Sequence, residues 1–151
     1  MRGLKETRTL SISELTPKLG MFDTILMLGN NFGLFANPRQ ARSLLRRFLK
    51  LTNPRAMIIT ESLDVYQTKD PDHLRYHQFN KRRGRMAGQV HIRVRYKKYA
   101  SPWFDYLLVS QKEMREIVEG TGWKIARFIS KSSPRKPRSA AVYLAIIQRQ
   151  Y

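Results

Sequence analysis

The sequence predicts an α/β fold, because short apolar runs alternate with a clear amphipathic helix. Residues 24–29 carry no charge, and a Gly-Asn-Asn turn at 29–31 follows them. An Asn-Pro pair then supplies an N-cap and a first helical residue, and an apolar stripe recurs at helical spacing over 38–52. Residues 56–60 form a second apolar run. Strand, turn, helix and strand in this order are typical of a parallel βαβ unit.

The βαβ pattern places two polar turns at one rim of the predicted sheet. Gly29 and Asn30 follow the first strand, and Glu61 follows the second strand directly. Because a right-handed crossover makes consecutive parallel strands neighbours, we expect Asn30 and Glu61 to lie side by side. Ligands bind at this rim in open α/β sheets. Glu61 can serve there as a substrate ligand or a base, or equally as a helix cap or a salt-bridge partner. The turn over 29–32 can bind a ligand, or equally be a tight connection that binds none.

Local patterns predict the remaining elements of the chain. Residues 7–12 alternate in polarity, which indicates a short strand. Ser110 and Glu113 have the spacing of a capping box, so we expect a helix from there to about Glu119. A strand over 123–130, an exposed basic loop over 131–139 and a last strand over 140–148 complete the chain.

Residues 64–104 form an excursion inserted between the strands, and most of its first part is polar. An Asp-Pro pair at its start predicts a helix over 71–83. Four polar residues share one face of this helix: His73, Tyr76, His77 and Asn80. The two histidines have the i, i+4 spacing of metal ligands, but neither a glutamate after the first nor a clear third ligand accompanies them. The sequence therefore predicts no metal site.

The second part of the excursion combines basic and aromatic residues. Residues 90–96 alternate between apolar and cationic side chains, which predicts an amphipathic strand that pairs with residues 103–109. No acidic residue occurs over positions 73–104. Arginines beside aromatic rings suit an anionic or planar substrate, or single-stranded nucleic acid. The residues concerned are Arg93, Arg95, Tyr96, Tyr99 and Trp103. The alternative is an outer sheet face in water.

Composition sets further bounds on the function. The 151 residues predict a single domain over 1–151. With 29 basic and 11 acidic residues the net charge is +18, which makes a polyanion a reasonable partner. The chain contains no cysteine, which excludes disulfides and thiolate catalysis and is compatible with a reducing cytoplasm. No apolar run approaches the roughly 20 residues of a membrane span, and we expect no membrane association.

Taken together, these pieces resemble the carboxyl-terminal half of a class I S-adenosyl-L-methionine-dependent methyltransferase. Residues 22–30 resemble the family's fourth strand, 56–60 its fifth, 113–122 the helix before strand six, and 140–148 strand seven. The phrase Gly120-Thr121-Gly122-Trp123-Lys124 is similar to the start of strand six. A longer pattern is similar to a little-described subgroup: residues 28–35, 76–77, 84–86, 93–96 and 102–105. The resemblance implies a partial Rossmann-like sheet of family strands three to seven, with flanking helices and an inserted β-hairpin.

The resemblance also implies a function and a set of site residues. It implies methyl transfer from S-adenosylmethionine to an unknown acceptor, a small molecule or RNA, that is held in line with the sulfonium. It places Ser11 and Ile12 near the cofactor's adenine, and Gly29 and Asn30 near its methionine end. The implied catalytic residues are Glu61 and His77. The implied acceptor-binding residues are Asn31, Phe32, Tyr66, Tyr76, Arg93, Arg95 and Trp103.

The sequence departs from the family at its start. It lacks the Gly-rich turn after strand one and the acidic residue after strand two, so a truncated domain is expected, with residues 7–12 as strand three. In the family order 3-2-1-4-5-7-6, the strand over 24–28 then becomes an open edge. We expect this edge to pair with a second copy or a partner chain, to accept residues 7–12, or to make the chain poorly soluble. The alternative functions are a basic RNA-binding module and a non-catalytic subunit on the same scaffold.

Overall fold

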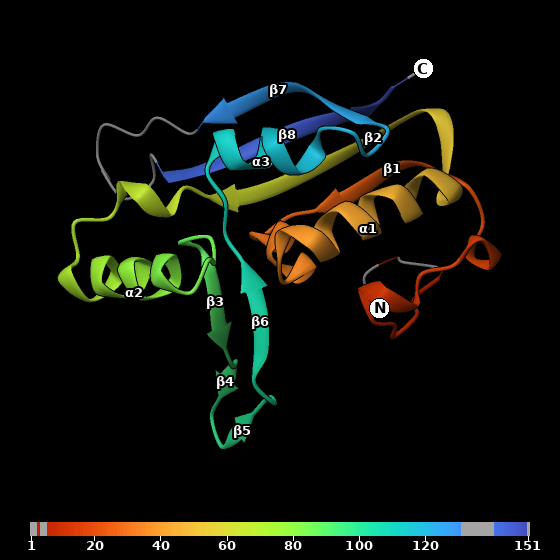
Figure 1. The fold of residues 1–151 in the computed structure, drawn as a ribbon. Helices are drawn as coiled ribbons and strands as arrows, with labels where there is room; N and C mark the ends of the chain where they lie inside the picture. Colours follow the sequence, from red (N-terminus) through yellow and green to blue (C-terminus); the bar gives the residue numbers. More distant parts are fainter. Residues whose placement is uncertain (1–2, 4–5, 131–140, 151) are drawn as a thin grey trace.

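The centre of the protein is a four-stranded sheet in the order β1-β2-β8-β7 (Figure 1). The computed structural model describes residues 3, 6–130 and 141–150. β1 (Phe22–Met27) pairs in parallel with β2 (Thr52–Leu63), and β8 (Val142–Arg149) runs antiparallel to both β2 and β7 (Trp123–Ser130). This order corresponds to strands 4-5-7-6 of the expected arrangement. The predicted α/β fold with a partial Rossmann-like sheet is therefore confirmed.

Helix α1 (Pro38–Phe48) makes the crossover between the two parallel strands. It begins as predicted, because the side-chain oxygen of Asn37 accepts a hydrogen bond from the amide of Gln40 at 2.9 Å and Pro38 occupies the first helical position. The predicted apolar stripe is buried, and it consists of Ala41, Leu44, Leu45 and Phe48. The helix then tightens into the 3-10 turn η4 (Leu49–Leu51) before β2 begins.

Helix α3 (Gln111–Val118) packs beside α1 and precedes β7 (Figure 1). The predicted capping box is present: the Ser110 hydroxyl accepts from the Glu113 amide at 3.3 Å, and the Glu113 carboxylate accepts from the Ser110 amide at 2.8 Å. Its apolar face is buried in the core. Gly120 follows at a φ of 70°, a left-handed conformation that suits glycine after a helix end.

The predicted excursion leaves the sheet after β2 and returns before α3. It comprises the turn η5 (Val65–Gln67), helix α2 (Pro71–Arg82) and a two-stranded ribbon. Each arm of the ribbon consists of two short strands. β3 (Gln89–Ile92) and β4 (Arg95–Tyr96) make the outgoing arm, and β5 (Tyr99–Ala100) and β6 (Phe104–Leu107) make the returning arm. β3 pairs with β6, and β4 pairs with β5. Figure 1 shows the ribbon projecting away from the sheet. The strand predicted over 90–96 is thus interrupted between β3 and β4.

The prediction of a strand over residues 7–12 is wrong. Residues 6–11 have no regular structure and are exposed, and the 3-10 turn η1 (Ile12–Glu14) begins directly after them. Ser11 caps this turn, and its amide donates to Glu14 at 2.7 Å. An alternating segment forms a strand only where a neighbouring strand can pair with it. In the described structure no strand pairs with residues 6–11.

The strand over 22–27 lies at an edge of the four-stranded sheet within the described residues, as expected. Its Leu26 side chain is 63% exposed, and the adjacent Leu28 is 48% exposed. The predicted loop over 131–139 and the first residue of the predicted strand over 140–148 lie outside the described residues. No helix in the described part of the chain is long and apolar enough to span a membrane.

Trp123 connects the sheet to α1 at the centre of the core. Its ring is fully buried, and its indole N–H donates to the carbonyl oxygen of Leu45 at 2.8 Å. The bond satisfies the ring's single polar atom, so the large apolar surface can be buried without an unpaired donor.

We predict that Trp123→Phe lowers the free energy of unfolding by about 2 kcal/mol, because it removes the bond to Leu45 and leaves a void. Urea denaturation followed by circular dichroism measures this loss. Lys124→Gln, at the exposed neighbouring position, should change stability by less than about 0.5 kcal/mol. An equally small effect of Trp123→Phe would contradict this description of the core.

Candidate functional site

The turn after β1 has an unusual backbone conformation. Gly29 and Asn30 both adopt positive φ angles, 71° and 61°. Glycine reaches this region freely, whereas asparagine is one of the few other residues that tolerate it. A Cβ atom added to Gly29 would meet nothing within 4 Å, so the space beside this turn is open. The 3-10 turn η3 (Asn31–Phe35) follows and leads into α1.

The structure brings Asn30 and Glu61 together, as the βαβ pattern predicts. The backbone amide of Asn30 donates to the Glu61 carboxylate at 3.2 Å. The register explains this contact: Met27 at the end of β1 lies opposite Thr60, so Glu61, the next residue of β2, lies beside the turn after β1. Glu61 was expected directly after the second strand, but β2 continues to Leu63 and pairs Glu61 with Leu144 of β8. Glu61 is half-buried, and a carboxylate that accepts a backbone N–H here fixes the turn.

Tyr106 on β6 holds the same turn from the other side. Its hydroxyl donates to the carbonyl oxygen of Asn30 at 2.6 Å. The ring lies against Gly33, where any Cβ atom would overlap it. Burial, and secondarily the negative charge of Glu61, raise the pKa of Tyr106, which keeps the donating hydroxyl protonated. We call Asn30, Glu61 and Tyr106 the turn cluster.

Sequence reasoning missed Tyr106. The residue is 76 positions from Asn30 along the chain, and no spacing rule links the two. The available signal is Gly33, since a glycine without a positive φ often marks a close approach by another group. The partner could not be named from that signal alone.

The two residues next to Asn30 in the predicted acceptor set lie in different environments. Asn31 is exposed at the start of η3. Phe32 is fully buried and packs edge-on against Phe35, with ring centroids 4.9 Å apart. In this structure Phe32 is therefore a core residue with no surface toward a ligand.

Ser11 and Ile12 line a small cavity of about 460 Å³. Leu34, Ala36 and Phe104 contribute to the same cavity. The ring of Phe104 packs edge-on against Tyr106 at 6.2 Å, so an aromatic pair links this cavity to the turn cluster. The predicted cofactor residues thus occupy two linked places.

A larger cavity of about 1120 Å³ lies between η5, α2 and β3. All three histidines of the chain line it, together with Tyr76. Its apolar lining includes Leu63, Val65, Ala87, Val90, Ile92 and Leu108. Because Leu63 ends β2, the cavity opens at the same rim of the sheet as the turn cluster. We call it the histidine cavity.

His77 and Tyr66 meet beside the histidine cavity. Their ring centroids are 6.0 Å apart, and the Tyr66 hydroxyl donates to Glu113 at 2.6 Å. Burial, the bond to Glu113 and nearby negative charge raise the pKa of Tyr66. Burial, and then the proximity of His73, lower the pKa of His77 below 6.5, so His77 is predominantly neutral at neutral pH. Glu61 contacts the turn and His77 lines the cavity, so the two predicted catalytic residues occupy different places.

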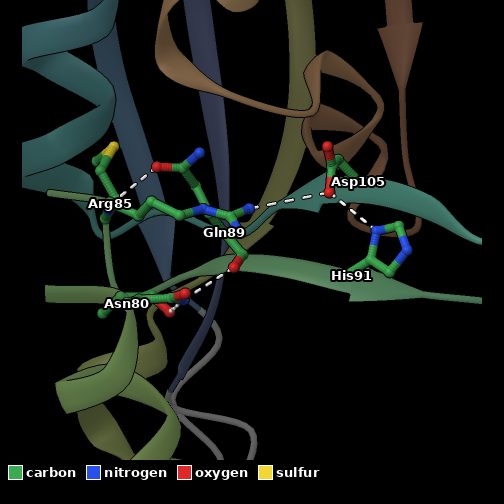
Figure 2. Close-up of polar contacts among 7 residues, drawn as sticks. Asn80, Arg85, Gln89, His91 and Asp105 are labelled. Carbon is green, nitrogen blue, oxygen red and sulfur yellow. Dashed lines mark hydrogen bonds and ion pairs between the residues drawn. The ribbon is translucent and has the colours of Figure 1, made fainter. Parts of the chain in front are cut away.

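A buried polar network fixes the loop between α2 and β3 (Figure 2). Asn80 is fully buried, and its amide nitrogen donates to the carbonyl oxygens of Ala87 at 3.0 Å and Gln89 at 2.8 Å. The Gln89 side chain accepts from the Met86 amide at 2.9 Å. The helical spacing puts Asn80 on the predicted polar face of α2, and the structure gives it this structural role.

The ribbon carries the remaining predicted residues. Trp103 stacks on His91 with centroids 5.5 Å apart, and the Arg93 guanidinium lies 4.9 Å from the Trp103 ring centre. Asp105 anchors this group, since it contacts His91 at 3.0 Å and Arg85 at 3.8 Å (Figure 2). Arg95 is exposed on β4. Arg93 and Trp103 thus join His91 at the rim of the histidine cavity, while Arg95 lies farther out. Among the described residues, no group of three potential ligands is arranged to hold a metal ion.

We predict that Gly33→Ala destabilises the protein by about 2 kcal/mol, because the added methyl displaces the Tyr106 ring. Thermal and urea denaturation measure the loss. In a Tyr106→Ala background the ring is absent, so the same glycine substitution should cost little. Equal costs in both backgrounds would refute the packing of Tyr106 on Gly33.

We predict that His73→Gln raises the pKa of His77, because it removes a neighbouring positive charge. The pKa should remain below 6.5, since burial is the larger cause and persists. Ring-proton NMR titration measures this value. His91→Gln, which leaves the His73–His77 pair intact, serves as the control; an unchanged or lower His77 pKa in His73→Gln would contradict the arrangement.

No protein-family model and no curated protein matches this sequence. Solved structures do match its fold. A SAM-dependent methyltransferase from Bacteroides fragilis, in complex with S-adenosyl-L-homocysteine, is similar at a TM-score of 0.73 and 23% identity, over 99% of this chain and 56% of that chain. A second SAM-dependent methyltransferase, from Methanosarcina mazei, is similar at a TM-score of 0.61 and 13% identity, over 85% of this chain and 59% of that chain.

A third methyltransferase, from Clostridium acetobutylicum, is similar at a TM-score of 0.60 and 9% identity, over 95% of this chain and 64% of that chain. The chain therefore spans between about half and two thirds of the length of these three structures. Sequence identity is low in every case, so the likeness concerns the fold. The chain has a partial class I methyltransferase fold.

Proposed function

We propose that this chain forms the acceptor side of an S-adenosylmethionine-dependent methyltransferase. The observation that carries the proposal is the turn cluster, in which a left-handed Gly29-Asn30 turn is held at the carboxyl rim of two parallel strands by Glu61 and Tyr106. Ligands of open α/β sheets bind at this rim. Three solved structures that share the fold are methyltransferases by name.

The residues at the turn fit part of the cofactor. The side-chain oxygen of Asn30 is buried and has no hydrogen-bond partner in the described structure, so it is available to a bound donor. The space beside Gly29 is open. Asn30 and Gly29 would contact the methionine end, and Ser11 and Ile12 would border the adenine. When bound, S-adenosylmethionine supplies an electrophilic methyl group.

The histidine cavity is the proposed acceptor site. Its lining is largely apolar, although Asp64, Asp70 and Asp72 also border it, and it suits a molecule with a substantial apolar or aromatic part. Tyr76 and His77 line it directly, and Tyr66 lies against His77. A neutral His77 can accept the proton of an acceptor hydroxyl or amine at neutral pH. Glu61 then acts as a positioning residue, because it holds the Asn30 amide.

Binding of S-adenosylhomocysteine to the whole 151-residue chain tests the cofactor half of this proposal. In an NMR titration to millimolar ligand, we expect the largest amide shifts at Gly29, Asn30, Ser11 and Ile12. Tyr106→Phe should weaken binding about fivefold, because one hydrogen bond that orients the turn is lost. Tyr99→Phe, on the exposed end of the ribbon, is the matched control and should bind as the unaltered chain does.

An absence of shifts at saturating ligand, or shifts confined to residues away from the turn, would overturn the proposed cofactor site. If the shifts appear but Tyr106→Phe binds normally, the turn cluster is not what organises the site.

A further inference from the structure

We propose that the projecting end of the ribbon binds single-stranded nucleic acid. We define this ribbon tip as residues 93–99 together with Trp103. It carries four cations, Arg93, Arg95, Lys97 and Lys98, and no acidic residue occurs over positions 73–104. Phosphate groups are the charge complement of such a surface. The proposal does not depend on methyl transfer.

Three aromatic rings at the ribbon tip face solvent. Tyr96 and Tyr99 are 68% and 67% exposed, and Trp103 is 56% exposed. Tyr96 and Tyr99 are directly opposite each other in the β4–β5 pair, so their side chains emerge on the same face. The two tyrosine rings are stacking platforms for unpaired bases. One face of Trp103 is already stacked on His91, so this ring adds exposed apolar surface beside them.

Cations lie beside each of these rings. Lys97 is 5.4 Å from the ring centre of Tyr96, and Lys98 is 5.6 Å from that of Tyr99. Arg93 makes the equivalent contact with Trp103. A base that stacks on a ring therefore brings its phosphate within reach of a cation, which is the combination that single-strand-binding surfaces use.

The backbone conformation of the Lys97-Lys98 turn between β4 and β5 also supports a binding role for its lysines. Lys97 has a φ of 52°, in the left-handed region that favours glycine or asparagine at a two-residue hairpin turn. A long cationic side chain is held here despite a conformational cost of order 1 kcal/mol. The tip also projects from the rest of the fold, where a strand of nucleic acid can reach it (Figure 1).

A membrane surface is the other polyanion that basic and aromatic residues can bind. Val94 is the only aliphatic residue among the exposed large hydrophobic side chains of the ribbon tip, so little apolar surface is available to enter a bilayer. The exposed rings and spaced cations favour unpaired bases. Unpaired RNA and unpaired DNA share these bases and phosphates, so the experiment includes both.

Fluorescence anisotropy of the full chain with a labelled 12-residue oligouridylate tests the proposal, beside an oligothymidylate, a duplex of equal length and vesicles of phosphatidylcholine and phosphatidylserine. Lys97→Gln with Lys98→Gln should weaken single-strand binding about tenfold and reduce the slope of log K against log salt by about 1.4, for two lost phosphate contacts. The control, Lys124→Gln with Arg127→Gln on β7, makes the same change in net charge and should have little effect.

Tyr96→Ala with Tyr99→Ala keeps every charge and should weaken binding of the oligouridylate at least tenfold if the rings stack on bases. Lys97→Gly relieves the turn, so it should preserve the melting temperature while weakening binding. Equal losses in the tip and control charge variants, full binding by the tyrosine variant, or preference for the duplex or the vesicles would each overturn the proposal. Tighter binding of oligouridylate than oligothymidylate would identify RNA as the ligand; the reverse would identify DNA.

Discussion

The parallel pairing of β1 with β2 is the constraint on which the candidate site depends. This pairing sets Met27 against Thr60, so the Asn30 amide reaches the Glu61 carboxylate. Tyr106 then closes the turn from a strand that belongs to the excursion. One contact within the sheet and one contact from outside it therefore determine the same turn. A change of the β1–β2 register by one residue would separate Asn30 from Glu61.

Polar contacts also attach the excursion to the rest of the fold. Glu113 caps α3 and at the same time accepts the Tyr66 hydroxyl, so the start of a core helix and the wall of the histidine cavity share one carboxylate. Asn80 fixes the loop before β3 from a fully buried position. The large cavity is consequently bounded by elements that side-chain hydrogen bonds help to hold.

Much of the sheet could be predicted from the sequence, because its signals are local. The apolar runs, the Asn37-Pro38 helix start and the Ser110–Glu113 capping box each depend on residues a few positions apart, and the parallel crossover rule then placed Asn30 beside Glu61. Features that depend on distant partners were not predictable in this way. Residues 7–12 have the pattern of a strand but no neighbour to pair with, and Phe32 reads as a turn residue although the core covers it. Tyr106 was missed because its partner is far away in the chain.

The open side of β1 links the candidate site to whatever lies along that strand. In the described structure β1 has a hydrogen-bonded neighbour on one side alone, and the Gly29-Asn30 turn is its direct continuation. Any segment that adds to the free side would restrain the strand and the turn together. By thermodynamic linkage, occupancy of the turn by a ligand and occupancy of the strand by a neighbour would then strengthen or weaken each other by the same factor.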